Sequence, residues 1–140
     1  MKKILLITIG VSALLFADFV KNGDIVTDTT TGLQWQDNTD SKNTTKTWSE
    51  AISYCENLTL GSHNDWRLPN INELKSIVDR SKFNPVIVDG FTNVRSDGYW
   101  SSTTHENYSS DAWLVRFDDG NVDNYSKVRN YDVRCVRAEQ

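Results

Sequence analysis

Several oxygen-bearing side chains fall close together in one short segment of this 140-residue chain: Asp118, Asp119, Asn121 and Asp123. Carboxylate and amide oxygens are the ligands that Ca²⁺ prefers in proteins. The segment lacks the complete Asp-x-Asp-x-Asp-Gly-x5-Glu loop of an EF-hand, and Asp, Gly and Asn are equally the residues of a tight hairpin turn. Two interpretations therefore stay open, a calcium site and a plain turn, and no other cofactor is predicted.

A second segment contains every residue type of a serine triad: Ser101, Ser102, His105 and Asp111. In such a triad a histidine takes the proton of the serine hydroxyl and an aspartate orients the histidine. The Gly-x-Ser-x-Gly pattern that presents a nucleophile on a sharp turn is absent from the sequence. The two histidines, His63 and His105, do not form a zinc pattern such as His-Glu-x-x-His. The sequence therefore favours a protein that is not an enzyme.

Aromatic side chains could stack on a ligand such as a sugar, because an aromatic ring combines apolar area with a polar edge. The five tryptophans all fall on the apolar side of a predicted helix or strand, which favours core packing: Trp35, Trp48, Trp66, Trp100 and Trp113. Tyr108 and Tyr125 lie among polar residues instead. These two tyrosines are the predicted ligand-contacting residues.

The N-terminus has the pattern of a cleavable signal peptide. Lys2 and Lys3 precede an almost wholly apolar run, and Ala17 stands where a signal peptidase would cut. The run has about 13 residues, against the ~20 that cross a bilayer as a helix, so a permanent anchor is the weaker alternative. A lipid anchor needs a cysteine directly at the cleavage point, where this chain has Asp18, so lipid anchoring is disfavoured. We expect residues 1–17 to be removed and residues 18–140 to form one periplasmic, secreted or cell-surface domain.

Charge restricts the partners of this domain. Loss of the two early lysines takes the formal charge from −4 to about −6, and the acidic residues are spread along the chain. Nucleic acids and other polyanions bind to clustered Lys and Arg, so both are disfavoured. Scattered, solvated charge is the simpler explanation of the basic residues near the C-terminus, with a local patch as the alternative: Lys127, Arg129, Arg134 and Arg137.

The first segments of the domain suggest one hairpin and one loop. Residues 18–24 are expected to be a short polar lead-in. Residues 25–28 and 33–36 flank a Thr-rich stretch that ends in glycine, which predicts a β-hairpin. The segment 37–46 contains no apolar residue and is expected to be a surface loop.

Two amphipathic helices are predicted next. A capping box, in which a Ser, Thr or Asn is followed three residues later by Glu, occurs at Thr47 and again at Asn70. Apolar residues at helical spacing follow each of them. Cys55 falls on the apolar stripe of the first helix and therefore faces the core, and the buried face of the second helix extends to Val78.

The second half of the domain is predicted to be a long loop followed by strands. Residues 80–98 contain a proline and two glycines and show no periodicity, so they form a loop. Strand-like composition and alternation then occur in four segments, of which the last turns Cys135 toward the core: 99–103, 112–117, 122–126 and 131–137.

The only two cysteines, Cys55 and Cys135, both fall on core-facing positions. In an oxidising compartment such a pair suits one structural disulfide, which would close a loop of about 80 residues. Two free buried thiols and a redox pair are the alternatives. Redox cysteines are usually close in sequence, as in Cys-x-x-Cys, and these two are not.

Five short motifs occur in order along the chain: Thr31-Gly32-Leu33-Gln34-Trp35, Tyr54-Cys55, Asp65-Trp66-Arg67-Leu68-Pro69-Asn70 with Glu73-Leu74, Tyr99-Trp100-Ser101-Ser102, and Val133-Arg134-Cys135-Val136-Arg137. Together they resemble the Lcl C-terminal domain family, a bacterial family named for a collagen-like adhesin. The resemblance implies a C-type-lectin-like α+β fold: two helices packed on a small twisted, mainly antiparallel sheet with long loops. It also implies a disulfide from the first helix to the last strand.

Differences from other lectin-like proteins bear on function. The Glu-Pro-Asn, Gln-Pro-Asp and Trp-Asn-Asp motifs of calcium-dependent C-type lectins are absent from the sequence. The segment around Arg67-Leu68-Pro69 is also similar to formylglycine-generating sulfatase-modifying enzymes. Those enzymes use two reactive cysteines near the C-terminus, where this chain has Cys135 alone.

We therefore predict an exported, non-catalytic binding or adhesion module. Its ligand would be a surface glycan, an extracellular-matrix protein or an envelope protein. The loop 80–98, the segment 103–111 and the turn 118–124 would form the contact surface, since loops on a rigid scaffold often carry binding residues. Two alternatives stay open: a cell-envelope enzyme distantly related to the sulfatase modifiers, and a structural subunit of a surface appendage.

Overall fold

The computed structural model describes residues 18–139, so the predicted signal peptide, residues 1–17, lies outside the described residues. Nine strands in two sheets and three short helices make up this part of the chain, which confirms the α+β class. The C-type-lectin-like arrangement stays a prediction. In the described part no helix is both long enough and apolar enough to cross a bilayer.

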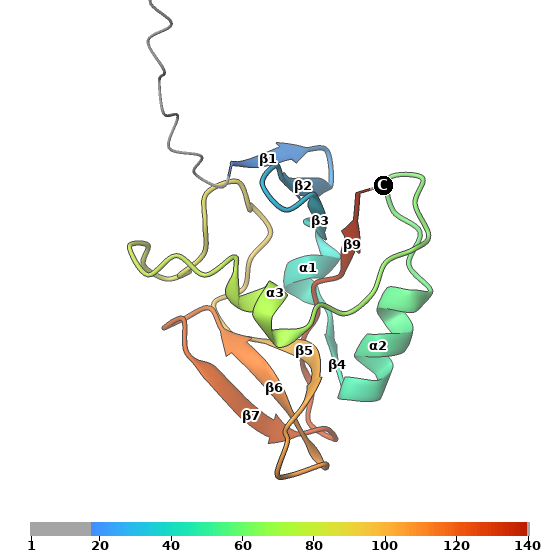
Figure 1. The fold of residues 1–140 in the computed structure, drawn as a ribbon, viewed down its shortest axis with the longest axis vertical. Coiled ribbons are helices and arrows are strands. Elements are labelled where there is room, and N and C mark those ends of the chain that lie inside the picture. The colour runs from blue at the N-terminus through green and yellow to red at the C-terminus, as the bar shows by residue number, and fades with distance from the viewer. Residues whose placement is uncertain (1–17, 140) are drawn as a thin grey trace, which may run out of the picture.

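The first sheet, sheet A, brings together both ends of the domain (Figure 1). Its strands are antiparallel and follow the order β1 (Phe19–Asn22), β2 (Ile25–Asp28), β3 (Leu33–Gln36) and β9 (Val136–Ala138). The predicted hairpin is confirmed as β2–β3. The predicted polar lead-in over residues 18–24 is wrong, because this segment contains strand β1. The Phe19 and Phe91 rings lie 6.1 Å apart between centroids, and Lys21 forms an ion pair with Asp37; both contacts hold β1 on the sheet.

The second sheet, sheet B, has five strands in the order β4 (Thr45–Lys46), β8 (Tyr131–Asp132), β5 (Gly98–Thr104), β6 (Asp111–Arg116) and β7 (Val122–Ser126). β5 and β8 run parallel, and the other pairs are antiparallel. The predicted single strand 131–137 is wrong: it divides into β8 and β9, which belong to different sheets. The residues between β8 and β9 cross from sheet B to sheet A. There the backbone N–H of Cys135 donates to the Gln36 side chain at 3.0 Å.

The segment 37–46 is not a surface loop. It contains α1 (Asp40–Asn43) and β4, and Asp37 and Ser41 within it are fully buried. The hydroxyl of Tyr99 donates to the Ser41 carbonyl at 2.5 Å. Composition alone predicted a loop, but partners distant in sequence bury this polar segment.

The two longer helices, α2 (Trp48–Glu56) and α3 (Ile71–Lys75), begin where the sequence predicts. At Asn70 the capping box is complete. At Thr47 it is not, because the hydroxyl donates to the Glu50 carboxylate (2.6 Å) and no backbone amide is capped. α3 ends at Lys75, earlier than predicted, and Val78 beyond it forms a bridge with Ile87.

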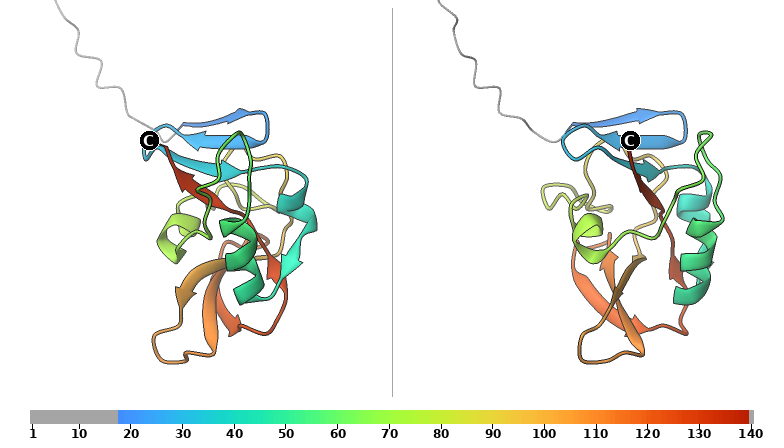
Figure 2. Two further views of the ribbon diagram at one scale, coloured as in Figure 1. Left: turned by 90° about the vertical axis from the view of Figure 1, so that its right-hand side faces the viewer. Right: turned by 45° about the vertical axis from the view of Figure 1, so that its right-hand side comes forward.

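The apolar core has two parts, one on each face of sheet B. The first contains Leu74 of α3 together with Val115 and Phe117. The second contains Ala51 and Cys55 of α2 together with other buried residues: Trp66, Leu68, Trp100, Ala112, Leu114, Val133 and Cys135. Figure 2 shows α2 and α3 on different sides of the molecule.

The predicted disulfide between Cys55 and Cys135 is confirmed. It joins α2 to the segment between β8 and β9, with 5.5 Å between the two Cα atoms, and both residues are fully buried. No cysteine of the described chain is free.

Candidate functional site

Sheet B is covered unequally along its strands. Successive side chains of a strand point to opposite faces, so Leu114 faces α2 while Trp113 and Val115 face the side of α3. Val115 is fully buried, whereas Trp113 is only half-buried. The prediction that Trp113 packs in the core is therefore wrong in part. The residues that bury Val115 leave the Trp113 indole partly open to solvent. Trp48, at the start of α2, is likewise only half-buried.

Three aromatic rings lie in contact at this end of the sheet, and we call them the aromatic platform: Trp113, His105 and Tyr108. The imidazole of His105 stacks on the Trp113 indole, with 4.5 Å between centroids and 28° between planes. The same imidazole also contacts Tyr108, with 5.0 Å between the centroids of the two rings. Tyr108 is 61% exposed, so the platform opens to solvent mainly through this ring.

The short connection between β5 and β6 holds the platform in place. The backbone N–H of His105 donates to the Asp111 carbonyl (2.9 Å), and that of Asp111 donates to the Tyr108 carbonyl (2.9 Å). Nδ1 of His105 accepts from the Asn107 N–H at 3.1 Å, which fixes the orientation of the imidazole. A loop closed by these bonds needs little reordering to bind a ligand.

Polar groups border the platform. The Trp113 indole N–H donates to the Glu106 carboxylate (3.1 Å), and the Asn124 amide donates to the Asp111 carboxylate (2.8 Å). The backbone N–H of Glu106 and the Trp113 N–H hold the pKa of the Glu106 carboxyl below its ordinary value. The border is thus anionic and rich in hydrogen-bond acceptors.

Lys127 joins the β5–β6 connection to the start of α2. Its Nζ lies 4.0 Å from the centroid of the Trp48 ring, a cation–π contact. The same ammonium group donates to the Thr104 hydroxyl (2.9 Å) and the Ser109 carbonyl (2.8 Å). These contacts occupy Lys127, so it braces the loop and adds little free positive charge to the platform.

The two tyrosines predicted to contact a ligand lie on different faces of sheet B. Tyr108 belongs to the aromatic platform. Tyr125 pairs with Ala112 and therefore shares the Leu114 face, where it is half-buried and lies 5.2 Å from the Tyr131 ring. The structure does not bring them together, and their contact with a ligand stays a prediction.

The residues of the hypothetical serine triad do not assemble. Ser101 is fully buried, and its hydroxyl donates to the Trp113 carbonyl at 2.6 Å. His105 accepts from a backbone amide and stacks on Trp113, and none of its described hydrogen bonds reaches Ser101, Ser102 or the Asp111 carboxylate. His63 lies apart, in a turn where its backbone pairs with Leu60.

The acidic segment forms the β6–β7 turn, with Gly120 at φ +80°. Arg116 reaches the Asp118 carboxylate at 2.9 Å and that of Asp123 at 3.9 Å, while Asp119 accepts from the backbone N–H of Asn121 at 2.8 Å. Across residues 18–139 no three His, Cys, Asp or Glu side chains are grouped so that they could hold a metal ion. The turn is confirmed, and calcium there stays a sequence prediction.

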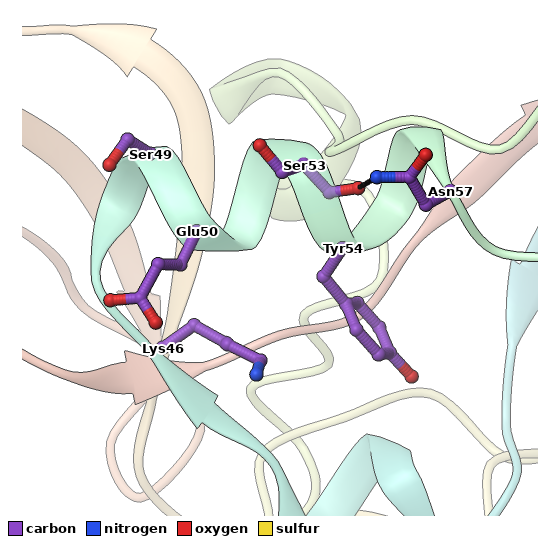
Figure 3. Close-up of a pocket in the computed structure, with 6 residues that line it drawn as sticks. All are labelled: Lys46, Ser49, Glu50, Ser53, Tyr54 and Asn57. Carbon is purple, nitrogen blue, oxygen red and sulfur yellow. Dashed lines mark hydrogen bonds between the residues drawn. The ribbon is translucent and has the colours of Figure 1, made fainter.

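An open hollow of about 370 Å³ lies between α2 and β4 (Figure 3). It is lined by Lys46, Ser49, Glu50, Ser53, Tyr54 and Asn57. Tyr54 is tied down at its hydroxyl, which donates to Asp40 and accepts from Gln36, each at 3.0 Å. Burial, together with Asp40, raises the pKa of Tyr54 to about 12, so the phenol stays neutral and offers only a hydrogen bond.

Two of the C-terminal arginines are buried, so the expectation of solvated charge is wrong for them. Arg134 is fully buried and donates to the Asp37 carboxylate at 3.0 Å. Arg137 makes a two-pronged contact with Asp65, with a shorter distance of 2.6 Å. Only Lys127 and Arg129 of the four lie toward solvent, and no basic patch forms from them.

A comparison with protein-family models matches residues 24–137 to the Lcl C-terminal domain. The chain belongs to this family. The match covers nearly all of the described residues, as the motif resemblance predicts. A comparison with curated proteins finds no relative that matches.

The motifs that identify this Lcl C-terminal domain mainly hold the fold. Trp66 donates from its indole N–H to the Leu60 carbonyl (3.2 Å). Arg67 binds both carboxylate oxygens of Glu73, which anchors the start of α3. The platform residues His105, Tyr108 and Trp113 lie outside the quoted motifs.

The sequence contained signals for the residues that were missed. On α2, Ser49, Ser53 and Asn57 recur every four positions opposite the apolar stripe, which is the pattern of an open polar helix face. Asp37 directly follows the strand residues Trp35 and Gln36, so it continues a buried strand. Nothing local indicates that His105 stacks on Trp113, because that contact depends on the closure of the β5–β6 connection.

Proposed function

We propose that this Lcl C-terminal domain is an exported, non-catalytic binding module that recognises neutral surface glycans through the aromatic platform. The observation that carries the proposal is the contact of Trp113, His105 and Tyr108 at the end of sheet B where Tyr108 is exposed to solvent. Aromatic faces pack against the apolar C–H face of a sugar ring. The acceptors on the border, Glu106 and Asp111, suit its hydroxyl groups.

The charge of the domain, and the hydrogen bonds that its polar groups already make, support a neutral ligand and a non-catalytic role. The chain has a formal charge of −4, and the border of the platform is anionic, so a sulfated or phosphorylated polymer would be repelled. The hydroxyl of Ser101 and Nδ1 of His105 already have partners, which favours binding over nucleophilic chemistry. The signal-peptide pattern and the disulfide support export to an oxidising compartment.

The test is binding of residues 18–140 to an array of neutral and anionic glycans and envelope proteins, with calcium and with chelator. We expect saturable binding to neutral glycans that does not need calcium. Tyr108→Ala should weaken it roughly 2- to 10-fold, the effect of one lost aromatic contact. Phe83→Ala is the matched control, because Phe83 is an exposed aromatic (89%) on a different loop.

Two results would contradict the proposal. One is saturable binding that Tyr108→Ala weakens no more than Phe83→Ala does. The other is binding to envelope proteins alone, which would make the ligand a protein.

A further inference from the structure

A second, smaller hollow lies on the Leu114 face of sheet B, opposite the aromatic platform. Its volume is about 150 Å³, and it is lined by Asp97, Gly98, Leu114, Arg116, Tyr125 and Tyr131. The lining comes from β5, β6, β7 and β8 and the residue before β5. Because Leu114 and Trp113 are consecutive in β6, the hollow and the platform face opposite ways. We call it the tyrosine groove.

The floor of the groove requires glycine at position 98. A Cβ atom there would lie 3.1 Å from the side chains of both Leu114 and Tyr131, closer than ordinary van der Waals contact. Glycine therefore allows the Tyr131 ring to lie down against the floor. Since Gly98 has an ordinary negative φ, the requirement is for space and not for an unusual backbone conformation.

The wall of the groove is a rigid aromatic surface. Tyr131 meets the buried Trp100 edge to face, with 5.0 Å between centroids and 90° between planes. The Tyr125 ring also contacts Tyr131, with 5.2 Å between centroids and 36° between planes. The guanidinium of Arg129 lies 5.5 Å from the Tyr125 centroid and supports that ring. Rings held in this way lose little freedom when a ligand packs against them.

The charges around the groove already balance each other. Arg116 is paired with Asp118 and Asp123, as described above for the turn. Asp97 lies 4.0 Å from Arg95, and one of its oxygens accepts from the Gly98 N–H at 2.8 Å. A charged ligand would have to compete with these pairs. A neutral ligand with hydroxyl groups needs only the unused lone pairs of Asp97 and the Tyr131 hydroxyl, because the Tyr125 side chain already interacts with Arg116.

We infer that the tyrosine groove is a second ligand site, which holds one neutral sugar ring beside Tyr125 and Tyr131, mainly through hydrogen bonds to the hydroxyl groups of the sugar. Ligand pockets for larger molecules start at roughly 300 Å³, so this volume suits a single ring. The inference rests on the proposed function only in assigning the same class of ligand. With both sites occupied, the domain would join two glycan segments across sheet B.

The experiment is an NMR titration of ¹⁵N-labelled residues 18–140 with the methyl glycosides of mannose, galactose and N-acetylglucosamine. We expect saturable shifts of the Gly98 and Tyr131 amides with at least one of them. Tyr125→Leu should weaken this binding at least 5-fold, and Tyr108→Leu should leave it unchanged. Asp97→Ala is the second variant and should also weaken this binding, because it removes the lone pairs that Asp97 offers to the ligand. Asp97 is half-exposed, so its loss leaves the core packing intact.

The two sites give separate outcomes. Shifts at His105 and Trp113 alone would overturn the groove and leave the proposed function standing. Shifts at Gly98 and Tyr131 alone would support the groove while contradicting the platform. No saturable shift at Gly98 with any of the three glycosides would overturn this inference.

Discussion

Asp37 and Asp132 are both buried and both feel the charge of Arg134, yet their surroundings differ. The carboxylate of Asp37 accepts from Lys21 (2.7 Å), Arg134 (3.0 Å) and three donors of the loop before β5: the N–H and hydroxyl of Thr92 and the N–H of Asn93. Asp132 is 1% exposed, and its Oδ1 has no hydrogen-bond partner in the described chain.

The difference shows that donors, and not depth, decide the charge of a buried carboxyl. Burial by itself raises the pKa of both groups. For Asp37 the hydrogen bond from Lys21, those from the loop and the charge of Arg134 outweigh burial, so its pKa lies below the ordinary value. For Asp132 burial dominates and raises the pKa to about 7, since the Arg95 and Arg134 charges only partly offset it and Asp97 adds to it.

The largest expected effect comes from the disulfide, which holds Cys135, and with it the neighbouring Arg134, in place. The bond closes a loop of 80 residues. Chain entropy then predicts that the Cys55→Ser, Cys135→Ser double variant loses about 4.5 kcal/mol in the free energy of unfolding. Denaturant titration measures this, and wild type with reductant should shift in the same direction. A loss below about 1 kcal/mol would show that Arg134 is held without the covalent bond.

The second variant removes the charge of Asp37. Asp37→Asn keeps the shape but removes the charge that compensates the buried Arg134, and removing one partner of a buried pair costs about 3–5 kcal/mol. Equilibrium unfolding at pH 7 checks this. Lys21→Met is the matched control, because Lys21 is 27% exposed and should cost only about 1 kcal/mol. If both variants lose the same free energy of unfolding, then the pairing of Asp37 with Arg134 is not the main reason for the effect of Asp37→Asn.

Asp37 shows which features of the fold sequence patterns can predict and which they cannot. The hairpin β2–β3, the cap at Asn70 and the disulfide depend on local chemistry or on strand and helix periodicity, and they could be predicted. The burial of Asp37 depends on Thr92 and Arg134, which are 55 and 97 residues away in sequence. A run of polar residues gives no sign of such partners, so residues 37–46 read as a loop.

The candidate site follows the same division. The sequence correctly placed Trp113 on an apolar side of its strand, but it did not show how far the cover on that face extends. That depends on where α3 ends, at Lys75, and on how the β5–β6 connection closes over His105. The exposure of Tyr108 was predictable from its polar neighbours, whereas its contact with His105 was not.

The effect expected at Asp132 is smaller and has the opposite sign, because removal of this charge stabilises the fold. In the unfolded chain this carboxyl titrates near its ordinary value of 3.8, and in the folded protein near 7. Between these values the folded state holds the extra proton, so the contribution of Asp132 to stability is complete below pH 4 and is lost as the pH rises through 7. Above pH 7 the folded protein carries an unpaired buried charge.

Asp132→Asn removes that charge at every pH. We expect it to raise the free energy of unfolding by about 1–3 kcal/mol at pH 8, the cost of an unsatisfied buried group, and by less at pH 5, where the folded protein still binds the proton. Urea titrations of both proteins at the two pH values measure the difference. Asp89→Asn is the control, since the Asp89 side chain is 88% exposed and its charge is not among those that shift the pKa of Asp132. If Asp132→Asn is less stable than wild type at pH 8, then the Asp132 carboxylate has a stabilising partner, and the contrast with Asp37 is one of degree.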